Sequence, residues 1–393
     1  MTRSPASPIH GSRAQPDIPP VSRFERDNIR RMQGYVWGEQ PADERTIKLN
    51  TNENPWPPGP AVARVLAGFD PARLRRYPPP HANGFRDVAA RLAGVDRDAI
   101  IATNGGDELL RLVLTTFLTP GRPLATTQPS YSLYPVLAAV QDCPTLEVPL
   151  GVDFGLPPEL AERANAAGAG VTCVVNPHAP SGRLFAVAEL DRLAEALDGI
   201  LLVDEAYVDF VDPALGHDAT DLVRRHDNVL ILRSMSKGYA LAGLRFGYGI
   251  GPPALIEPLL NKTRDSYNVD LLAQELATAA LADQEWAMAN RSAVRAERTR
   301  LADALAALGF ECPSSQANFL FPRVPPGADA LALQRALKAA GILVRHFAGS
   351  GLADRLRITI GTPHEDDALL ATLAGALGDP AASKTASRRG GKG

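Results

Sequence analysis

The chain has 393 residues, of which 45% are hydrophobic and 22% are charged, a composition typical of an ordinary globular protein. Its formal net charge of −3 argues against binding to nucleic acid or to an anionic membrane. Its three cysteines are widely spaced without a CxxC pair, so neither a disulfide framework nor a metal site is indicated. No apolar run is long enough to span a membrane, and we expect a cytoplasmic protein.

The two ends of the chain differ in composition from the rest. Residues 1–22 are rich in Pro, Ser and Arg, and residues 379–393 are similar, so both are predicted to be disordered tails. Residues 23–58 are predicted to form an N-terminal arm. Within this arm, residues 50–58 are too rich in Pro and Asn for regular structure, and we expect an extended binding loop there.

Helical and strand patterns alternate from residue 59 onward. Strands are predicted at 99–102, 123–127, 145–149, 171–175, 200–203 and 229–232. Helices are predicted at 61–68, 84–93, 158–167 and 187–197, and two more end at 118 and 140. Such alternation indicates a mostly parallel sheet flanked by helices. We therefore predict a large α/β domain over residues 59–267.

The pattern changes after Gly251. A long helical region rich in Ala and Leu is predicted at about 268–308. It is followed by a strand at 317–322, a helix at 328–340, strands at 342–346 and 355–360, and a last helix at 364–377. These elements predict a smaller α+β domain over residues 268–378.

Six polar residues follow two of the predicted strands, those at 200–203 and 229–232. They are Asp204, Tyr207, Ser234, Ser236, Lys237 and Arg245. In open α/β sheets, ligands bind at the carboxyl ends of the strands. A carboxylate, a phenol, two hydroxyls, an amine and a guanidinium together suit a ligand with a ring nitrogen, a ring oxygen, an aldehyde and a phosphate. That description fits pyridoxal 5'-phosphate (PLP), although Lys237 taken alone would be interpreted as an ordinary exposed lysine.

Four of the residues near the predicted strand ends suit particular parts of PLP. Lys237 is the candidate for the Schiff base, and its pKa must be lowered by desolvation or by a cation such as Arg245. Asp204 is expected to face the ring nitrogen and keep it protonated, the alternative being a helix cap. Tyr207 could donate to the ring oxygen. Tyr131, after a Pro-Ser turn, is suited to stacking on the ring, the alternative being a core tyrosine.

Two anion sites are also predicted. Gly105, Gly106 and Asp107 begin a helix, where free N–H groups favour the cofactor phosphate, and Ser234, Ser236 and Arg245 would complete that site. In the C-terminal domain, Arg345 and Arg357 lie in predicted strands. A buried Arg357 would need an anionic partner, such as a substrate carboxylate or phosphate. The alternative is a solvent-facing arginine on an edge strand.

Seven segments, spread over about residues 24–376, resemble the fold-type I PLP aminotransferases, and most closely the histidinol-phosphate aminotransferases. They are Tyr35-Val-Trp-Gly-Glu-Gln-Pro41, Lys48-Leu-Asn-Thr-Asn-Glu-Asn-Pro55, Arg76-Tyr-Pro78, Gly105-Gly-Asp-Glu108, Val203-Asp-Glu-Ala-Tyr207, Ser234-Met-Ser-Lys-Gly-Tyr-Ala-Leu-Ala-Gly-Leu-Arg245 and Leu356-Arg-Ile-Thr-Ile-Gly-Thr362. The resemblance implies a homodimer with shared active sites. It also implies amino-group transfer between L-histidinol phosphate and 2-oxoglutarate, yielding glutamate, in histidine biosynthesis.

For individual residues, the resemblance implies the PLP contacts predicted above. It adds a substrate site made of Tyr35, Asn54, Arg345 and Arg357, with Trp56 of the partner subunit reaching in. Two positions depart from the family pattern. Ala179 stands where the family usually has an asparagine that bonds the ring oxygen, and Trp56 stands where it usually has a tyrosine.

Other functions remain open on the sequence. An aminotransferase for aromatic or other amino acids, or a PLP-dependent decarboxylase of a phosphorylated amino acid, would use the same lysine and the same phosphate site. A regulator with an aminotransferase-like domain would need a DNA-binding module, which the first 22 residues do not supply. A nucleotide-binding Rossmann protein is disfavoured because no G-x-G-x-x-G follows the first strand of the alternating region.

Overall fold

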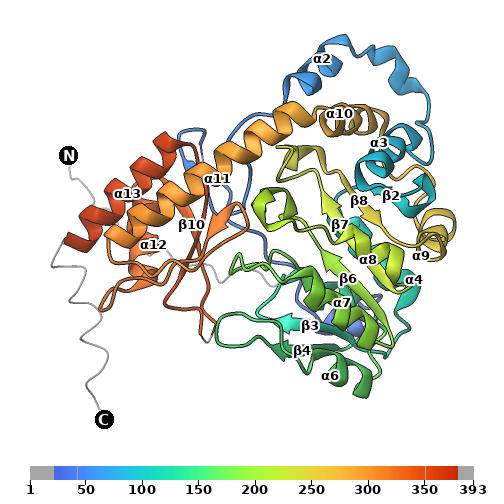
Figure 1. Ribbon diagram of the computed structural model, residues 1–393, viewed down its shortest axis with the longest axis horizontal. Helices are drawn as coiled ribbons and strands as arrows, with labels where there is room; N and C mark the ends of the chain where they lie inside the picture. Colours follow the sequence, from blue (N-terminus) through green and yellow to red (C-terminus); the bar gives the residue numbers. More distant parts are fainter. Residues whose placement is uncertain (1–21, 42, 350, 379–393) are drawn as a thin grey trace, which may run out of the picture.

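The computed structural model describes residues 22–41, 43–349 and 351–378. Apart from Ser22, the two predicted disordered tails lie outside these residues. The described chain forms a seven-stranded sheet and a four-stranded sheet, each packed against helices (Figure 1). This is the predicted architecture of a large α/β domain and a smaller C-terminal domain.

The large sheet is almost entirely parallel. Its strands, in spatial order, are β2 (Ile100–Thr103), β8 (Gly247–Ile250), β7 (Val229–Ser234), β6 (Ile200–Asp204), β5 (Val171–Val175), β3 (Leu124–Gln128) and β4 (Thr145–Pro149). Strand β8 is antiparallel to both of its neighbours, β2 and β7. Strand β8 is not predicted from the sequence, because two glycines in four residues weaken a strand pattern. A side chain at Gly247 would collide with the backbone of Gly105, 2.7 Å away.

Eight helices of the described chain accompany the large sheet. They are α2 (Pro60–Gly68), α3 (Asn83–Ala93), α4 (Gly106–Phe117), α5 (Leu133–Val140), α6 (Leu160–Ala166), α7 (Val187–Ala196), α8 (Thr220–Arg225) and α9 (Pro253–Pro258). The first six lie where the sequence predicts helices, to within a few residues. The short helices α8 and α9 are not predicted from the sequence. The five helices from α4 to α8 connect the strands of the sheet.

The small sheet contains β1 (Ile47–Leu49), β10 (Ile342–His346), β11 (Leu356–Thr359) and β9 (Phe319–Leu320), in that spatial order. Its helices are α11 (Gln284–Ala307), α12 (Ala330–Ala339) and α13 (Pro363–Gly378), whereas α10 (Leu271–Ala282) lies beside α2 and α3 of the large domain (Figure 1). Two predictions need correction. The helical region expected at 268–308 is interrupted at Asp283, whose carboxylate caps α11 by accepting from Trp286 N at 3.3 Å. The strand expected at 317–322 has two residues.

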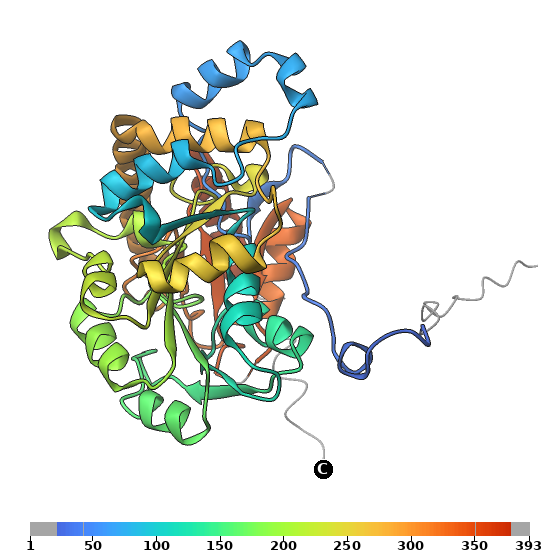
Figure 2. The ribbon, with the colours of Figure 1, turned by 90° about the vertical axis from the view of Figure 1, so that its right-hand side faces the viewer.

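The N-terminal arm contributes a strand to the small sheet. Strand β1 pairs in parallel with β10, with Ile47 opposite Ile342 and Leu49 opposite Val344. The residues before β1, including the short helix α1 (Asp27–Arg31), run along the outside of the molecule (Figure 2). Asn28 fastens this part to the end of α5 by donating to Ala139 O at 2.9 Å. As predicted, residues 50–58 form no helix or strand.

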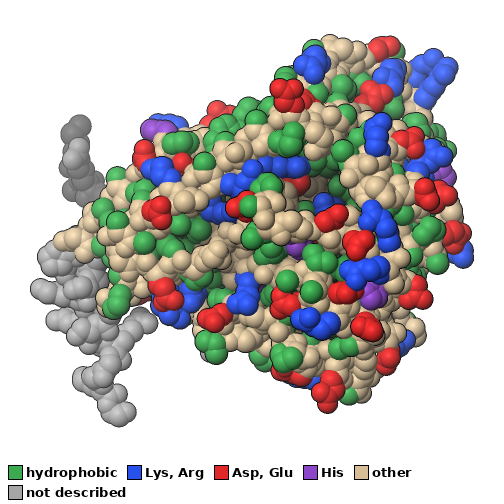
Figure 3. All heavy atoms as spheres, in the orientation of Figure 1, with side chains coloured by type: hydrophobic (Ala, Val, Ile, Leu, Met, Phe, Trp, Pro, Cys, Tyr) green, Lys and Arg blue, Asp and Glu red, His purple; other side chains and the backbone are tan. Residues whose placement is uncertain are grey.

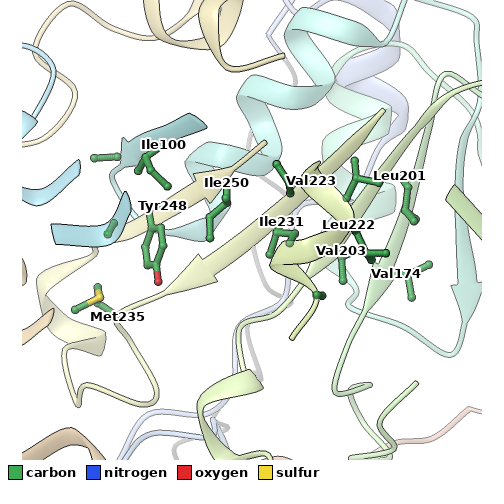
Figure 4. Packing of buried hydrophobic residues seen from close by; sticks show 14 of the residues in the cluster. Ile100, Val174, Leu201, Val203, Leu222, Val223, Ile231, Met235, Tyr248 and Ile250 are labelled. Atoms are coloured by element: carbon green, nitrogen blue, oxygen red, sulfur yellow. The ribbon is translucent and has the colours of Figure 1, made fainter. Parts of the chain in front are cut away.

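Apolar side chains cover both faces of the large sheet. Along β6, Leu201 and Val203 point to one cluster of buried residues, and Leu202 points to another on the opposite face. Figure 4 shows the first of these clusters, with Ile231 between Val203 and Ile250. Each fully buried aliphatic side chain contributes about 1.5–3 kcal/mol to folding. Packing on both faces therefore holds the central strands in place, and it also holds in place the polar residues at their ends.

The surface agrees with the composition. On the face shown in Figure 3, acidic and basic side chains are interspersed. Within the described part of the chain, no helix has both the length and the apolar character needed to cross a membrane.

Candidate active site

A cavity of about 570 Å³ lies at the carboxyl ends of the parallel strands. Twelve of the residues predicted to bind cofactor or substrate line it: Tyr35, Gly106, Asp107, Tyr131, Asp204, Tyr207, Ser234, Ser236, Lys237, Arg245, Arg345 and Arg357. Three others, Gly105, Asn54 and Trp56, do not line it. The fold thus brings together residues from the arm, the large domain and the small sheet.

Lys237 lies just after β7 with its amine in a half-buried position. Its Nζ donates to Thr51 O at 2.9 Å. Desolvation lowers the pKa of Lys237 to about 8; the carboxylate of Glu53 opposes this effect, and Arg357, Lys48 and Arg245 add to it. Of the two causes expected from the sequence, desolvation and the charge of Arg245, desolvation is the larger.

Asp204 ends β6 and is 4% exposed. Its carboxylate accepts hydrogen bonds from Tyr134 Oη at 2.8 Å and from Ala206 N at 3.1 Å. Burial raises the pKa of Asp204 to about 6, the two hydrogen bonds oppose the rise, and the nearby carboxylates of Asp107 and Glu205 add to it. The charged groups that act on this buried carboxylate, Asp107 and Glu205, carry its own sign, and a protonated ring nitrogen would supply an opposite charge.

Tyr207 follows β6, and its hydroxyl oxygen accepts from Asn52 Nδ2 at 3.0 Å. Its ring meets Phe319 edge-on, with the ring centroids 5.1 Å apart. Burial raises the pKa of Tyr207, although the charge of Arg357 opposes the rise. The phenol therefore stays protonated near neutral pH and is able to donate into the cavity.

Ala179 is one of the cavity-lining residues and offers a methyl group where the family usually has an amide. The side chain of Asn176, three residues earlier, is occupied elsewhere. It donates to Phe185 O at 3.2 Å and accepts from Phe185 N at 2.7 Å. Neither residue of this loop is therefore placed to donate to a ring oxygen.

The predicted phosphate site lies at the start of α4, which begins at Gly106. The first N–H groups of a helix have no partners within it and favour an anion. Gly105 has a φ of +79°, and a Cβ there would lie 2.7 Å from Arg245 Nη2. Glycine at this position therefore lets the guanidinium approach the helix terminus. Arg245 also pairs with Asp107 at 3.4 Å, and Ser234 Oγ accepts from Ser236 N at 3.1 Å.

Arg345 and Arg357 lie directly opposite each other on the antiparallel strands β10 and β11. Like charges in this arrangement repel each other. Arg357 donates to Asn50 O at 2.9 Å, but its buried Nε has no hydrogen-bond partner in the structure. Strand β11 lies inside the small sheet, so the alternative of an arginine on an edge strand is wrong. An anion between the two guanidinium groups would relieve both the repulsion and the missing bond.

The remaining predicted substrate residues differ in their placement. The Tyr35 ring lies beside that of Tyr131, with centroids 6.0 Å apart. Asn54 donates to Lys237 O at 2.9 Å and so supports the lysine through its backbone. Trp56 packs against the apolar core of the small sheet, away from the cavity of its own chain.

Three residues with evident contacts in the site are given no role by the sequence analysis. Tyr134 holds the Asp204 carboxylate, Asn52 contacts Tyr207, and Glu53 contacts Lys48 beside Lys237. Burial raises the pKa of Glu53, but hydrogen bonds from Lys48 and Thr51 outweigh it, so the pKa lies below its ordinary value. Tyr134 occupies an apolar helix and has the sequence signature of a core residue. Asn52 and Glu53 belong to a motif whose spacing does not reveal their partners.

Comparison with known proteins places the chain among aminotransferases. Residues 44–373 match the family described as aminotransferase class I and II. A histidinol-phosphate aminotransferase of Trichormus variabilis is 42% identical over 354 residues, which cover 90% of this chain and 99% of that protein.

Two solved structures share the fold. One is a histidinol-phosphate aminotransferase from Sinorhizobium meliloti in complex with pyridoxal 5'-phosphate, with a TM-score of 0.82 and 23% identity over 91% of this chain and 98% of the other. The other is an L-threonine-O-3-phosphate decarboxylase from Porphyromonas gingivalis, with a TM-score of 0.70 and 23% identity over 85% and 100%. At this level of identity, the likeness shows a common fold.

Proposed function

We propose that this chain, which belongs to the aminotransferase class I and II family, transfers the amino group of L-histidinol phosphate to 2-oxoglutarate, forming glutamate, in histidine biosynthesis. The observation that carries the proposal is the pair of opposed guanidinium groups, Arg345 and Arg357, in the same cavity as Lys237. The pair provides an anion site, and the lysine provides the reactive amine.

The residues present fit PLP as the cofactor. The buried Asp204 matches a protonated ring nitrogen, and Gly105 leaves room for Arg245 beside the N–H groups of α4. Tyr207 and Tyr131 would contact the ring oxygen and the ring face. When bound, PLP supplies an electron sink that makes the substrate Cα–H bond acidic.

Lys237 is the group that moves the proton. Its amine is neutral in a useful fraction of molecules near pH 7, because its pKa is about 8, and so it is able to take the proton from the substrate Cα. Asp204 holds a proton on the ring nitrogen, and its hydrogen bond from Tyr134 favours the ionised carboxylate that this task requires. Asn54 keeps the Lys237 backbone in place during the transfer.

Arg345 and Arg357 bind the anionic end of each substrate. Histidinol phosphate carries a phosphate and no α-carboxylate, whereas 2-oxoglutarate carries two carboxylates. A guanidinium group makes paired hydrogen bonds with either kind of anion, so the same two residues serve both half-reactions. The neighbouring rings of Phe319 and Phe347, about 5.5 Å and 5.6 Å from the Arg357 guanidinium carbon, limit access of water to this end of the cavity.

The proposal includes a cytoplasmic homodimer with shared active sites. Its support is the placement of Trp56, which lies outside the cavity of its own chain although the family resemblance gives that position a role in substrate binding. Trp56 of the partner subunit would complete each site. Sedimentation of the PLP-loaded protein at micromolar concentration would show one species of twice the chain mass.

The deciding experiment is a single half-reaction. PLP-loaded protein is mixed with L-histidinol phosphate, and the absorbance of the bound cofactor is followed with time. We expect rapid conversion to the amino form, slower conversion with phenylalanine or glutamate, and none in a Lys237→Ala control. Faster conversion with phenylalanine would contradict the assigned substrate, and release of carbon dioxide from a phosphorylated amino acid would indicate a decarboxylase instead.

A further inference from the structure

Asn52 lies where the arm, the large domain and the small sheet meet. It is 1% exposed and has a φ of +58°, a left-handed conformation that asparagine tolerates better than most residues. Its backbone N–H donates to Thr359 Oγ1 at 3.0 Å, and its backbone oxygen accepts from Asn318 Nδ2 at 3.0 Å. The small sheet therefore fixes the position and conformation of Asn52.

The hydrogen bonds also fix which end of the Asn52 amide faces Tyr207. A backbone N–H is always a donor, so Thr359 Oγ1 accepts from Asn52 N and its own hydrogen remains available. That hydrogen is donated to Asn52 Oδ1, 3.2 Å away. The amide oxygen is thus directed to Thr359, and the Nδ2 group is left to donate to the Tyr207 hydroxyl oxygen at 3.0 Å.

This orientation determines the direction of the Tyr207 proton. The hydroxyl oxygen receives a hydrogen bond from Asn52, so its single hydrogen points elsewhere. Among the described residues, we find no acceptor bonded to that hydroxyl, and Tyr207 lines the cavity. We infer that Asn52 is a positioning residue that, with Thr359, turns the Tyr207 proton into the cavity toward the ring oxygen of the cofactor. The inference rests on the proposed cofactor and deepens the proposed function.

The orientation of the Tyr207 hydroxyl matters more in this chain because position 179 is an alanine. Ala179 has no donor to offer, so Tyr207 is left to stabilise a negative ring oxygen among the residues assigned here. A hydroxyl turned the other way would present a lone pair to that oxygen and repel it. The amide of Asn52 prevents this, because its Nδ2 group cannot accept a proton.

The test uses the pH at which the absorbance of the bound cofactor changes, a readout that does not depend on turnover. In Asn52→Asp, a carboxylate oxygen replaces the Nδ2 group and accepts the Tyr207 proton, so the ring oxygen loses its donor. We expect the midpoint to rise by about one pH unit, the effect of one charge-assisted hydrogen bond. The new charge alone would also raise it. The same substitution is therefore made in a Tyr207→Phe background, where we expect less than a third of the shift.

Three further variants complete the design. Thr359→Val removes the hydroxyl that orients the amide and should raise the midpoint, whereas Thr359→Ser keeps the hydroxyl and should leave it unchanged. Asn228→Asp makes the same chemical change at a half-buried asparagine that bonds the end of α7, and should not move the midpoint. If Asn52→Asp does not fold, the comparison of Thr359→Val with Thr359→Ser decides.

The outcomes separate this inference from the proposed function. An equal shift of Asn52→Asp in both backgrounds, no shift at all, or equal behaviour of the two Thr359 variants would overturn the role of Asn52. A normal set of shifts in a protein that does not respond to L-histidinol phosphate would overturn the substrate and leave Asn52 supported. A wild-type chain that binds no PLP would overturn both.

Discussion

Lys237 must lose the charge of its amine before it is able to react with an aldehyde. With a pKa of about 8, roughly a tenth of the amines are neutral at pH 7, against a few in ten thousand for an ordinary lysine. Since the neutral amine attacks the aldehyde, the rate of PLP capture by cofactor-free protein should rise about tenfold per pH unit below 8 and level off above it. Stopped-flow absorbance measures this rate.

The neighbouring Glu53 provides a control for that pH dependence. Its carboxylate raises the pKa of Lys237. In Glu53→Gln, the rate of PLP capture should therefore level off at a lower pH. A capture rate that keeps rising to pH 10 in the wild-type chain would contradict the lowered pKa.

The residues that the sequence identifies are those whose role follows from their position on a strand. Asp204 and Lys237 lie at or just after buried apolar runs, so their location at the sheet edge follows from local pattern. Tyr134 and Asn52 act through contacts with residues 70 and 155 positions away. No local periodicity encodes such contacts, and these roles become visible once the chain is folded.

At the scale of elements, the pairing of β10 with β11 sets the substrate site. Arg357→Lys keeps the charge but loses the planar set of donors, so we expect the KM for L-histidinol phosphate to rise ten- to a hundredfold. Arg355→Lys is the matched control. Arg355 lies two residues earlier, donates to Phe321 O and does not line the cavity, so its substitution should affect stability and leave KM unchanged. An equal rise of KM in both variants, measured by steady-state kinetics, would contradict the role of Arg357 in substrate binding.

The loop after β5 meets the small domain at Gly182, which has a φ of +79°. A Cβ at this position would collide with Ser315 Oγ. Gly182→Ala should therefore lower the free energy of unfolding by about 3 kcal/mol, from backbone strain and overpacking together. Gly216→Ala, with a φ of +57° and open space around it, should cost about 1 kcal/mol. Equal midpoints of urea unfolding for the two variants would contradict a steric collision at position 182.

The predicted strands agree with the structure where the local sequence pattern is enough to identify a strand. The strands β5 and β6 and the first four residues of β7 are buried, and they appear in the sequence as mostly apolar runs. Strand β1 is missed because three residues, Ile47 to Leu49, carry too little pattern, and its partner β10 lies far along the chain. Strand β8 is missed because its glycines serve close packing, Gly247 against Gly105 and Gly249 against Ile101 and Leu109, which no local rule expresses.

For the whole molecule, the cavity concentrates positive charge. Five cationic side chains line it against three carboxylates, so an anionic cofactor reduces the excess positive charge as well as adding contacts. At a hundredfold excess over its dissociation constant, a ligand adds about 2.7 kcal/mol to stability. Removing PLP should lower the Tm of the wild-type chain by several degrees in scanning calorimetry. In Lys237→Ala, the Tm values with and without PLP should differ by less. Equal Tm values with and without PLP would contradict this.

The pairing of β1 with β10 has a consequence for folding during synthesis of the chain. Ile47 to Leu49 leave the ribosome early, but their partner Ile342 to Val344 follows about 300 residues later. At typical rates of synthesis, this delay is roughly 15–60 seconds. During that time the large sheet is able to fold, whereas Asn50 to Glu53, which follow β1 and line the cavity, have no small sheet to hold them. The nascent chain therefore cannot acquire a complete active site until translation is nearly over.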